Sequence, residues 1–160
     1  MERLQILAVI IVSFTSIFPV CLLAQNSPQD YLKIHNDARA AVGVKPLLWD
    51  QRLESYAIVF MRKHIEDCLE GEDIHPTGYS QNIAHTRTSE YLLTGADAVK
   101  SWVAQKRFYD YKTNSCITGN PGDCINYIAV VSKESTYLGC SRAICNNGCT
   151  LVTCYYAPTN

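Results

Sequence analysis

The chain has 160 residues, a formal net charge of −1 at neutral pH and 48% hydrophobic residues. This near-neutral balance argues against nucleic acid or an acidic membrane surface as the main partner. The length suits one globular domain that buries its own core, with a short leader in front of it.

Residues 1–24 have the pattern of a secretory signal peptide. Arg3 precedes an apolar run, and small Ala24 stands just before polar residues. The run is short and is followed by a proline, which makes a membrane anchor the weaker interpretation. We therefore expect cleavage after Ala24, a single domain over residues 25–160, secretion, and no transmembrane segment.

Three segments begin with helix-capping signals. Ser27 precedes a proline and has an acid three residues later, Asp50 precedes an apolar periodic run, and Thr94 has an acid three residues later. Apolar residues at helical spacing follow each signal. The first helix is expected to end at Gly43, and the second, which is predicted to be part of the core, near Cys68.

Two polar features of the N-terminal half of the chain are predicted to have no chemical role. His35, on the first helix, is predicted to be structural, since a single helical histidine seldom carries chemistry alone. The acidic residues between positions 66 and 73 are predicted to be solvated, and cation capture is the alternative.

Strands are expected mainly in the second half of the chain. A short extended piece ends the segment 75–84, and residues 123–132 are rich in β-branched and aromatic side chains. As a strand, 123–132 would place Asn126 on a mostly apolar face. Residues 137–144 and 149–156 predict two more strands, which favours an antiparallel meander in an α+β domain.

Removal of the leader leaves an odd number of cysteines. In an exported chain these residues are expected to form disulfides rather than metal sites, with one thiol left over. Their spacing does not select one pairing among the alternatives. The cysteines are Cys68, Cys116, Cys124, Cys140, Cys145, Cys149 and Cys154.

Many short blocks, in order along residues 25–160, carry a resemblance to a known family. They include Gln-Asn-Ser-Pro-Gln-Asp-Tyr at 25–31, His-Asn at 35–36, Leu-Trp-Asp at 48–50, Asp-Cys at 67–68, Ala-Val-Lys at 98–100, Trp-Val at 102–103, Lys-Arg-Phe-Tyr-Asp-Tyr at 106–111, Leu-Gly-Cys at 138–140, Cys-Asn-Asn-Gly at 145–148 and Cys-Tyr-Tyr at 154–156. The chain thus resembles plant pathogenesis-related class 1 proteins of the CAP superfamily, which comprises cysteine-rich secretory, allergen and pathogenesis-related proteins.

The resemblance implies an α-β-α sandwich, with a three- to four-stranded antiparallel sheet between layers of helices. It also implies three disulfides and leaves Cys149 unpaired, with a buried inert thiol favoured over a reactive one. The implied pairs are Cys68 with Cys145, Cys116 with Cys124, and Cys140 with Cys154.

Most members of the family carry two His and two Glu side chains that can bind a divalent metal such as Zn²⁺. The resemblance places these positions at His75, Gln81, Gln105 and Asn126. Amides are weak neutral ligands and cannot act as general bases at neutral pH. We therefore expect no metal, no cofactor and no catalytic residue. The alternative is a metal site rescued by Asp73, His85 or Asp123.

Some family members bind sterols beside a Tyr-Asp-Tyr segment. The residues that would do so in this chain are Phe108, Tyr109, Tyr111 and Ile117, and the alternative is that these aromatics simply pack the core. The leading hypothesis is a monomeric, non-enzymatic defence protein of the apoplast that binds a sterol or other lipid. The alternatives are a metal-dependent hydrolase or metal-regulated protein, and a scaffold that binds a protein partner through Cys149.

Overall fold

The computed structural model describes residues 25–68 and 78–158. Within them no helix is long and apolar enough to cross a membrane. The predicted leader, residues 69–77 and the last two residues lie outside the described part. The elements are α1 (Pro28–Ala40), β1 (Leu48–Trp49), α2 (Gln51–Lys63), β2 (Ser80–His85), α3 (Gly95–Ala104), η2 (Gln105–Phe108), β3 (Tyr109–Asp110), β4 (Ser115–Cys116), η3 (Pro121–Asp123), α4 (Ile125–Val131), β5 (Tyr137–Ile144) and β6 (Thr150–Ala157).

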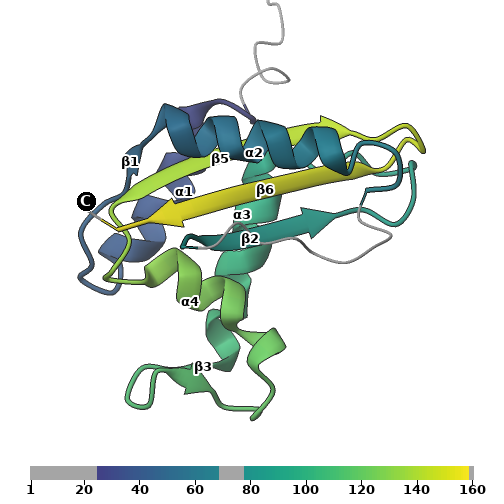
Figure 1. The fold of residues 1–160 in the computed structure, drawn as a ribbon. Coiled ribbons are helices and arrows are strands. Elements are labelled where there is room, and N and C mark those ends of the chain that lie inside the picture. Colours follow the sequence, from purple (N-terminus) through teal and green to yellow (C-terminus); the bar gives the residue numbers. More distant parts are fainter. Residues whose placement is uncertain (1–24, 69–77, 159–160) are drawn as a thin grey trace, which may run out of the picture.

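A four-stranded sheet in the order β1-β5-β6-β2 forms the middle layer. Helix α2 packs on one face, while α1, α3 and α4 lie on the other (Figure 1). The expected α+β sandwich is confirmed. The sheet is mixed rather than fully antiparallel, because the short β1 runs parallel to β5 and pairs Leu48 with Tyr137. The long pair β5 and β6 is antiparallel, with Cys140 opposite Cys154.

The three predicted helix starts are confirmed. The Ser27 hydroxyl and the Asp30 carboxylate form a complete capping box at α1. The side chains of Asp50 and Thr94 accept backbone hydrogen bonds at the starts of α2 and α3. These caps satisfy amide groups that have no partner within the helix, which explains why local sequence was sufficient here.

The strand predicted at 123–132 is wrong. Residues Ile125–Val131 form the helix α4, and a short 3-10 turn precedes it. Its buried side chains, Tyr127, Val130 and Val131, follow the three- and four-residue steps of a helix rather than the alternation of a strand. Consequently the meander has only two consecutive strands, β5 and β6.

The described residues contain three disulfides, and these join the pairs that the family resemblance implied. Cys68 is bonded to Cys145, Cys116 to Cys124, and Cys140 to Cys154. Cys149 is a free thiol that is 7% exposed, in the cluster between α2 and the sheet.

Candidate functional site

Of the four positions that the resemblance implied for a metal site, the three that the structure describes do not lie together. His75 is outside the described residues. Gln81, on β2, donates through Nε2 to Thr153 Oγ1 at 2.9 Å, and Thr153 lies between Leu151 and Tyr155, which face α2. Gln105 and Asn126 lie on the opposite side of the sheet, at the end of α3 and in the first turn of α4.

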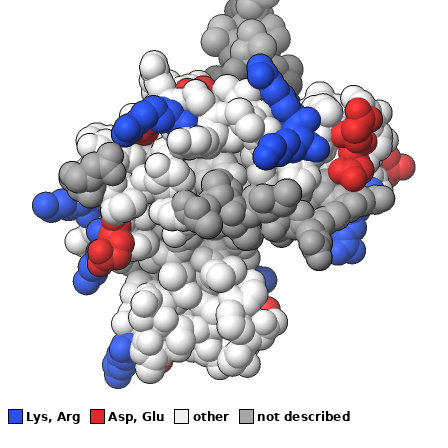
Figure 2. All heavy atoms as spheres, viewed as in Figure 1, with Lys and Arg blue, Asp and Glu red and all other residues white. Residues whose placement is uncertain are grey.

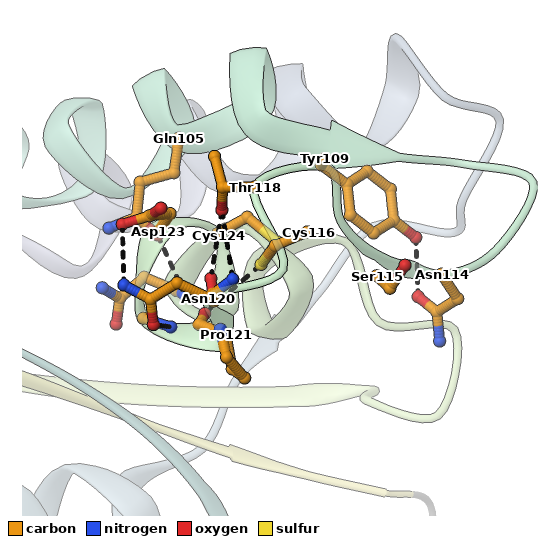
Figure 3. The surroundings of a disulfide bond; sticks show 12 residues. Gln105, Tyr109, Asn114, Ser115, Cys116, Thr118, Asn120, Pro121, Asp123 and Cys124 are labelled. Atoms are coloured by element: carbon orange, nitrogen blue, oxygen red, sulfur yellow. Dashed lines mark hydrogen bonds between the residues drawn. A yellow bond between two sulfur atoms is a disulfide. The ribbon is translucent and has the colours of Figure 1, made fainter.

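Gln105 has a specific structural task in this arrangement. Its Oε1 accepts a hydrogen bond of 3.1 Å from the backbone N–H of Asn126. Figure 3 shows the Gln105 side chain directed from α3 towards the segment around Asp123 and Cys124 that precedes α4. Cys124, the residue at the N-cap, makes no side-chain capping bond of its own. Gln105 therefore caps α4 from another element, since it satisfies one of the free amides at the helix start.

Asn82, the neighbour of Gln81, connects α4 to the core and was missed by the sequence analysis. Its Nδ2 donates to the carbonyl of Asn126 at 3.0 Å and to the Tyr156 hydroxyl at 2.9 Å. That hydroxyl is also 2.9 Å from Nε2 of His35, whose Nδ1 is 2.8 Å from the carbonyl of Tyr31. Asn82 is the one fully buried residue of β2, at 1% exposure, and a buried amide needs hydrogen-bond partners. The sequence signal was a polar residue next to Ile83 in the strand-like piece, which alone does not show burial.

His35 is fully buried and uses both ring nitrogens in this network, as the structural interpretation expected. Burial lowers the pKa of His35 to about 4, and the nearby charge of Arg39 also lowers it. The ring is therefore neutral at ordinary pH, and both of its nitrogens are already engaged. These observations favour a packing role over proton transfer.

Within residues 25–68 and 78–158, the positions implied for the metal carry only the amides Gln81, Gln105 and Asn126, which are weak ligands for a divalent metal. Among the described residues, no group of three or more His, Cys, Asp or Glu side chains is arranged to hold an ion. His85 ends β2 four residues beyond Gln81, about 13 Å along the strand. The Asp123 carboxylate accepts from Asn120 Nδ2 at 3.3 Å. Asp73 lies outside the described residues. His85 and Asp123 thus belong to no group of three or more His, Cys, Asp or Glu side chains in the part of the chain that the structure describes.

A cavity of about 550 Å³ with a mixed lining lies between α4, the end of α1 and the segment around β3. Its polar part comes from Asn114, Ser132, Lys133 and Glu134. The aliphatic part of its lining comes from Val42, Val44, Ile128 and Val131. Two of the residues expected to contact lipid, Tyr109 and Tyr111, also line it. The other two do not: Phe108 lies under the guanidinium of Arg107 at 4.6 Å, and Ile117 is 64% exposed.

A second apolar cavity, of about 360 Å³, adjoins the first and shares Asn114 and Ile128 with it. Ile125 and Pro121 also line it. Figure 2 shows that the lobe below the sheet, which contains β3 in Figure 1, carries few charged side chains on the face drawn. The two adjoining cavities along α4, which both include Ile128 in their lining, are named the apolar channel.

Tyr109 and Tyr111 line this channel, and the buried ring of Tyr127 contacts both of them. The ring centroids of Tyr109 and Tyr111 are 4.6 Å apart, and those of Tyr109 and Tyr127 are 5.4 Å apart, all edge to face. Tyr109 donates to Asn114 Oδ1 at 2.7 Å, and the Tyr111 and Tyr127 hydroxyls are hydrogen-bonded to each other. Burial raises the pKa values of Tyr109 and Tyr127, so these phenols are neutral polar groups beside an apolar space.

The fold agrees with comparisons to known proteins. The model of the cysteine-rich secretory protein family, CAP, matches residues 32–156, and the chain belongs to this family. Over 136 residues it is 48% identical to the "Basic form of pathogenesis-related protein 1" of Nicotiana tabacum, covering 84% of this chain and 72% of the relative. It is 42% identical to "Pathogenesis-related protein 1" of Arabidopsis thaliana, covering 84% and 78%.

Solved structures show the same fold at lower identity. Venom allergen-like protein 4 of Schistosoma mansoni is 23% identical with a TM-score of 0.61, covering 82% of this chain and 88% of that one. A structure titled BmVAL-1 is 19% identical with a TM-score of 0.63, covering 88% and 82%. At these identities the likeness concerns the fold alone.

Proposed function

We propose that this chain is a secreted, non-enzymatic defence protein of the apoplast that binds a sterol or a similar lipid along α4. The observation that carries the proposal is the 550 Å³ cavity, one side of which is aliphatic and includes the tyrosines Tyr109 and Tyr111. The predicted leader and the pathogenesis-related names of the relatives support secretion and a defence role.

The chemistry of the cavity suits a rigid apolar molecule with one polar end. Ligand sites of 300–1,000 Å³ usually combine an apolar lining with a few polar groups that fix orientation. Here Val42, Val44 and Ile128 provide apolar surface, while the phenols are available to a hydroxyl. The non-enzymatic part of the proposal rests on the amides at Gln105 and Asn126, which can neither hold Zn²⁺ well nor take a proton.

A fluorescent sterol such as dehydroergosterol tests the proposal. We expect saturable binding to the secreted chain, weakened at least about tenfold by Ile128→Asn, because a polar amide would enter the apolar channel. Ile144→Asn is the matched control, since Ile144 is 48% exposed at the end of β5 and should bind like the parent.

If Ile128→Asn has a lowered melting temperature, Val44→Asn makes the same test from the α1 side of the cavity. The absence of saturable binding by the parent chain would refute the lipid proposal. Equal binding by both cavity variants would show that the ligand lies elsewhere and would contradict the assigned site.

The structure gives less support to a thiol-linked protein partner. Cys149 is 7% exposed and packs in the same cluster as Cys68 and Cys145. A thiol at this depth is poorly accessible for an intermolecular disulfide. We therefore favour the binding role at α4 over a scaffold that acts through Cys149.

A further inference from the structure

A separate polar cavity of about 220 Å³ lies between the start of α1, β1, α2 and β5. Its lining includes Tyr31, Trp49, Glu54 and Arg142, and it shares no residue with the apolar channel along α4. Of the positions that the family resemblance implied for metal or lipid, none that the structure describes lies in it. The polar and charged lining of this cavity is therefore not explained by the metal or lipid roles.

The Tyr31 hydroxyl is the first unusual feature of this polar cavity. Tyr31 is 1% exposed, and its hydroxyl has no hydrogen-bond partner in the structure. The ring is fixed in place, because a Cβ on Gly95 would lie 2.2 Å from its Cζ, and the Trp49 ring is 6.0 Å away between centroids. A buried hydroxyl without a partner costs about 1–3 kcal/mol, and such groups are rare unless something else satisfies them.

Two opposite charges also line the polar cavity without pairing with each other. Glu54 accepts from Trp49 Nε1 at 2.9 Å through Oε2. Arg142 donates through Nε to the carbonyl of Leu93 at 2.6 Å. Both side chains are half-buried, and no ion pair joins them. These bonds use one carboxylate oxygen and one guanidinium nitrogen, which leaves Oε1 and both Nη groups for a ligand.

We propose that this polar cavity binds a small zwitterion, namely a free α-amino acid with an aliphatic side chain. The ligand carboxylate would accept from Arg142 and from the Tyr31 hydroxyl, and its ammonium would donate to Glu54. The side chain would lie against the Trp49 ring. A zwitterion is the simplest ligand that satisfies the cation, the anion and the buried hydroxyl together.

The dimensions of the polar cavity agree with a ligand of this class. At about 220 Å³ it is smaller than the 300–1,000 Å³ of typical drug-sized sites, so a sterol does not fit. Burial raises the pKa of Tyr31, and the nearby Arg142 charge partly opposes this effect. The phenol is thus a neutral donor at ordinary pH, as a carboxylate requires.

Calorimetric titration of the secreted chain with L-leucine tests the assignment. We expect saturable binding at one site per chain. Two analogues that each lack one charge, 4-methylpentanoate and 3-methylbutylamine, should each bind at least about tenfold more weakly, because one protein charge then stays unpaired. Dehydroergosterol should not compete, so this result and the lipid result are independent.

Tyr31→Phe is the most informative variant for the polar cavity. It removes an unpartnered hydroxyl and keeps the ring, so the melting temperature should be unchanged or slightly higher, while L-leucine affinity falls about fivefold or more. Thr150→Val is the matched control, because the Thr150 hydroxyl is also buried without a partner but does not line this cavity. It should bind L-leucine like the parent.

Glu54→Gln tests the ammonium contact, since a glutamine oxygen can still accept from Trp49. Its expected result is loss of the preference for L-leucine over 4-methylpentanoate. The proposal is overturned by no saturable L-leucine binding in the millimolar range, by equal affinity for L-leucine and 4-methylpentanoate, or by unchanged affinity in Tyr31→Phe.

Discussion

Helix α4 and strand β6 are similar in amino-acid composition but differ in secondary structure. Ile125–Val131 reads Ile-Asn-Tyr-Ile-Ala-Val-Val, and Thr150–Ala157 reads Thr-Leu-Val-Thr-Cys-Tyr-Tyr-Ala. Both are dominated by β-branched and aromatic residues, which favour strands. Only Thr150–Ala157 forms one, and it is buried along its whole length between β5 and β2.

The difference comes from what each segment can contact. Strand β6 has hydrogen-bonding partners along both edges. Helix α4 is instead secured at its two ends by side chains from other elements. Gln105 accepts from the amide of Asn126 at the start, and Arg39 donates through Nη1 to the carbonyls of Val130 at 3.0 Å and Ser132 at 2.8 Å at the end. Propensity is thus overridden by tertiary contacts at helix ends.

The largest expected effect comes from removing Arg39. This side chain is 1% exposed and also donates to the carbonyls of Lys45 and Ser135. Arg39→Met should lower the free energy of unfolding by about 3–5 kcal/mol, because several buried carbonyls lose their donor. Chemical denaturation measures it.

If α4 depends on this contact, helix content and sterol binding should be lost in Arg39→Met before the sheet unfolds. Arg62→Met, an exposed arginine on α2, is the control and should change stability little. A similar loss of stability in Arg39→Met and Arg62→Met would contradict the stabilising role of the Arg39 contacts at the end of α4.

A smaller effect is expected from pH, acting on the His35 contact with β6. The pKa of His35 is about 4 in the folded protein, against an ordinary value of 6.5. Between these values only the unfolded chain binds the proton, so stability falls as pH drops from about 6.5 towards 4, by roughly 3 kcal/mol.

Urea unfolding at a series of pH values measures this slope. His35→Gln should flatten it over that window, whereas His85→Gln, at an exposed position, should not. An unchanged slope in His35→Gln would indicate that other groups control the acid sensitivity.

The smallest effect is expected at the start of α4. Gln105→Met should cost about 1 kcal/mol, the usual contribution of a helix cap. Gln105→Glu should keep the cap and gain a few tenths of a kcal/mol, because a negative charge is favourable near a helix N-terminus. Urea midpoints measure both variants, with Gln29→Met on the exposed surface of α1 as the control. If the urea midpoint of Gln105→Met equals that of the control, the inference that Gln105 caps α4 is wrong.

The candidate sites could be predicted only in part. The Tyr109 and Tyr111 positions were found because they belong to a recognisable block, and both line the apolar cavity. The polar cavity was not predicted, because Tyr31, Glu54 and Arg142 come from three distant parts of the chain. Nor could the sequence show that Gln81 faces α2 while Gln105 and Asn126 lie across the sheet.

The sequence by itself determined the features that depend on near neighbours. Ser27, Asp50 and Thr94 start helices because each satisfies amides a few residues away, and β5 and β6 lie close together in the sequence with the turn residues Asn146, Asn147 and Gly148 between them. Only the tertiary structure decided that Ile125–Val131 is a helix and which polar groups meet in a cavity. In those places the deciding partners are distant in sequence, and their contacts exist only once the layers have packed.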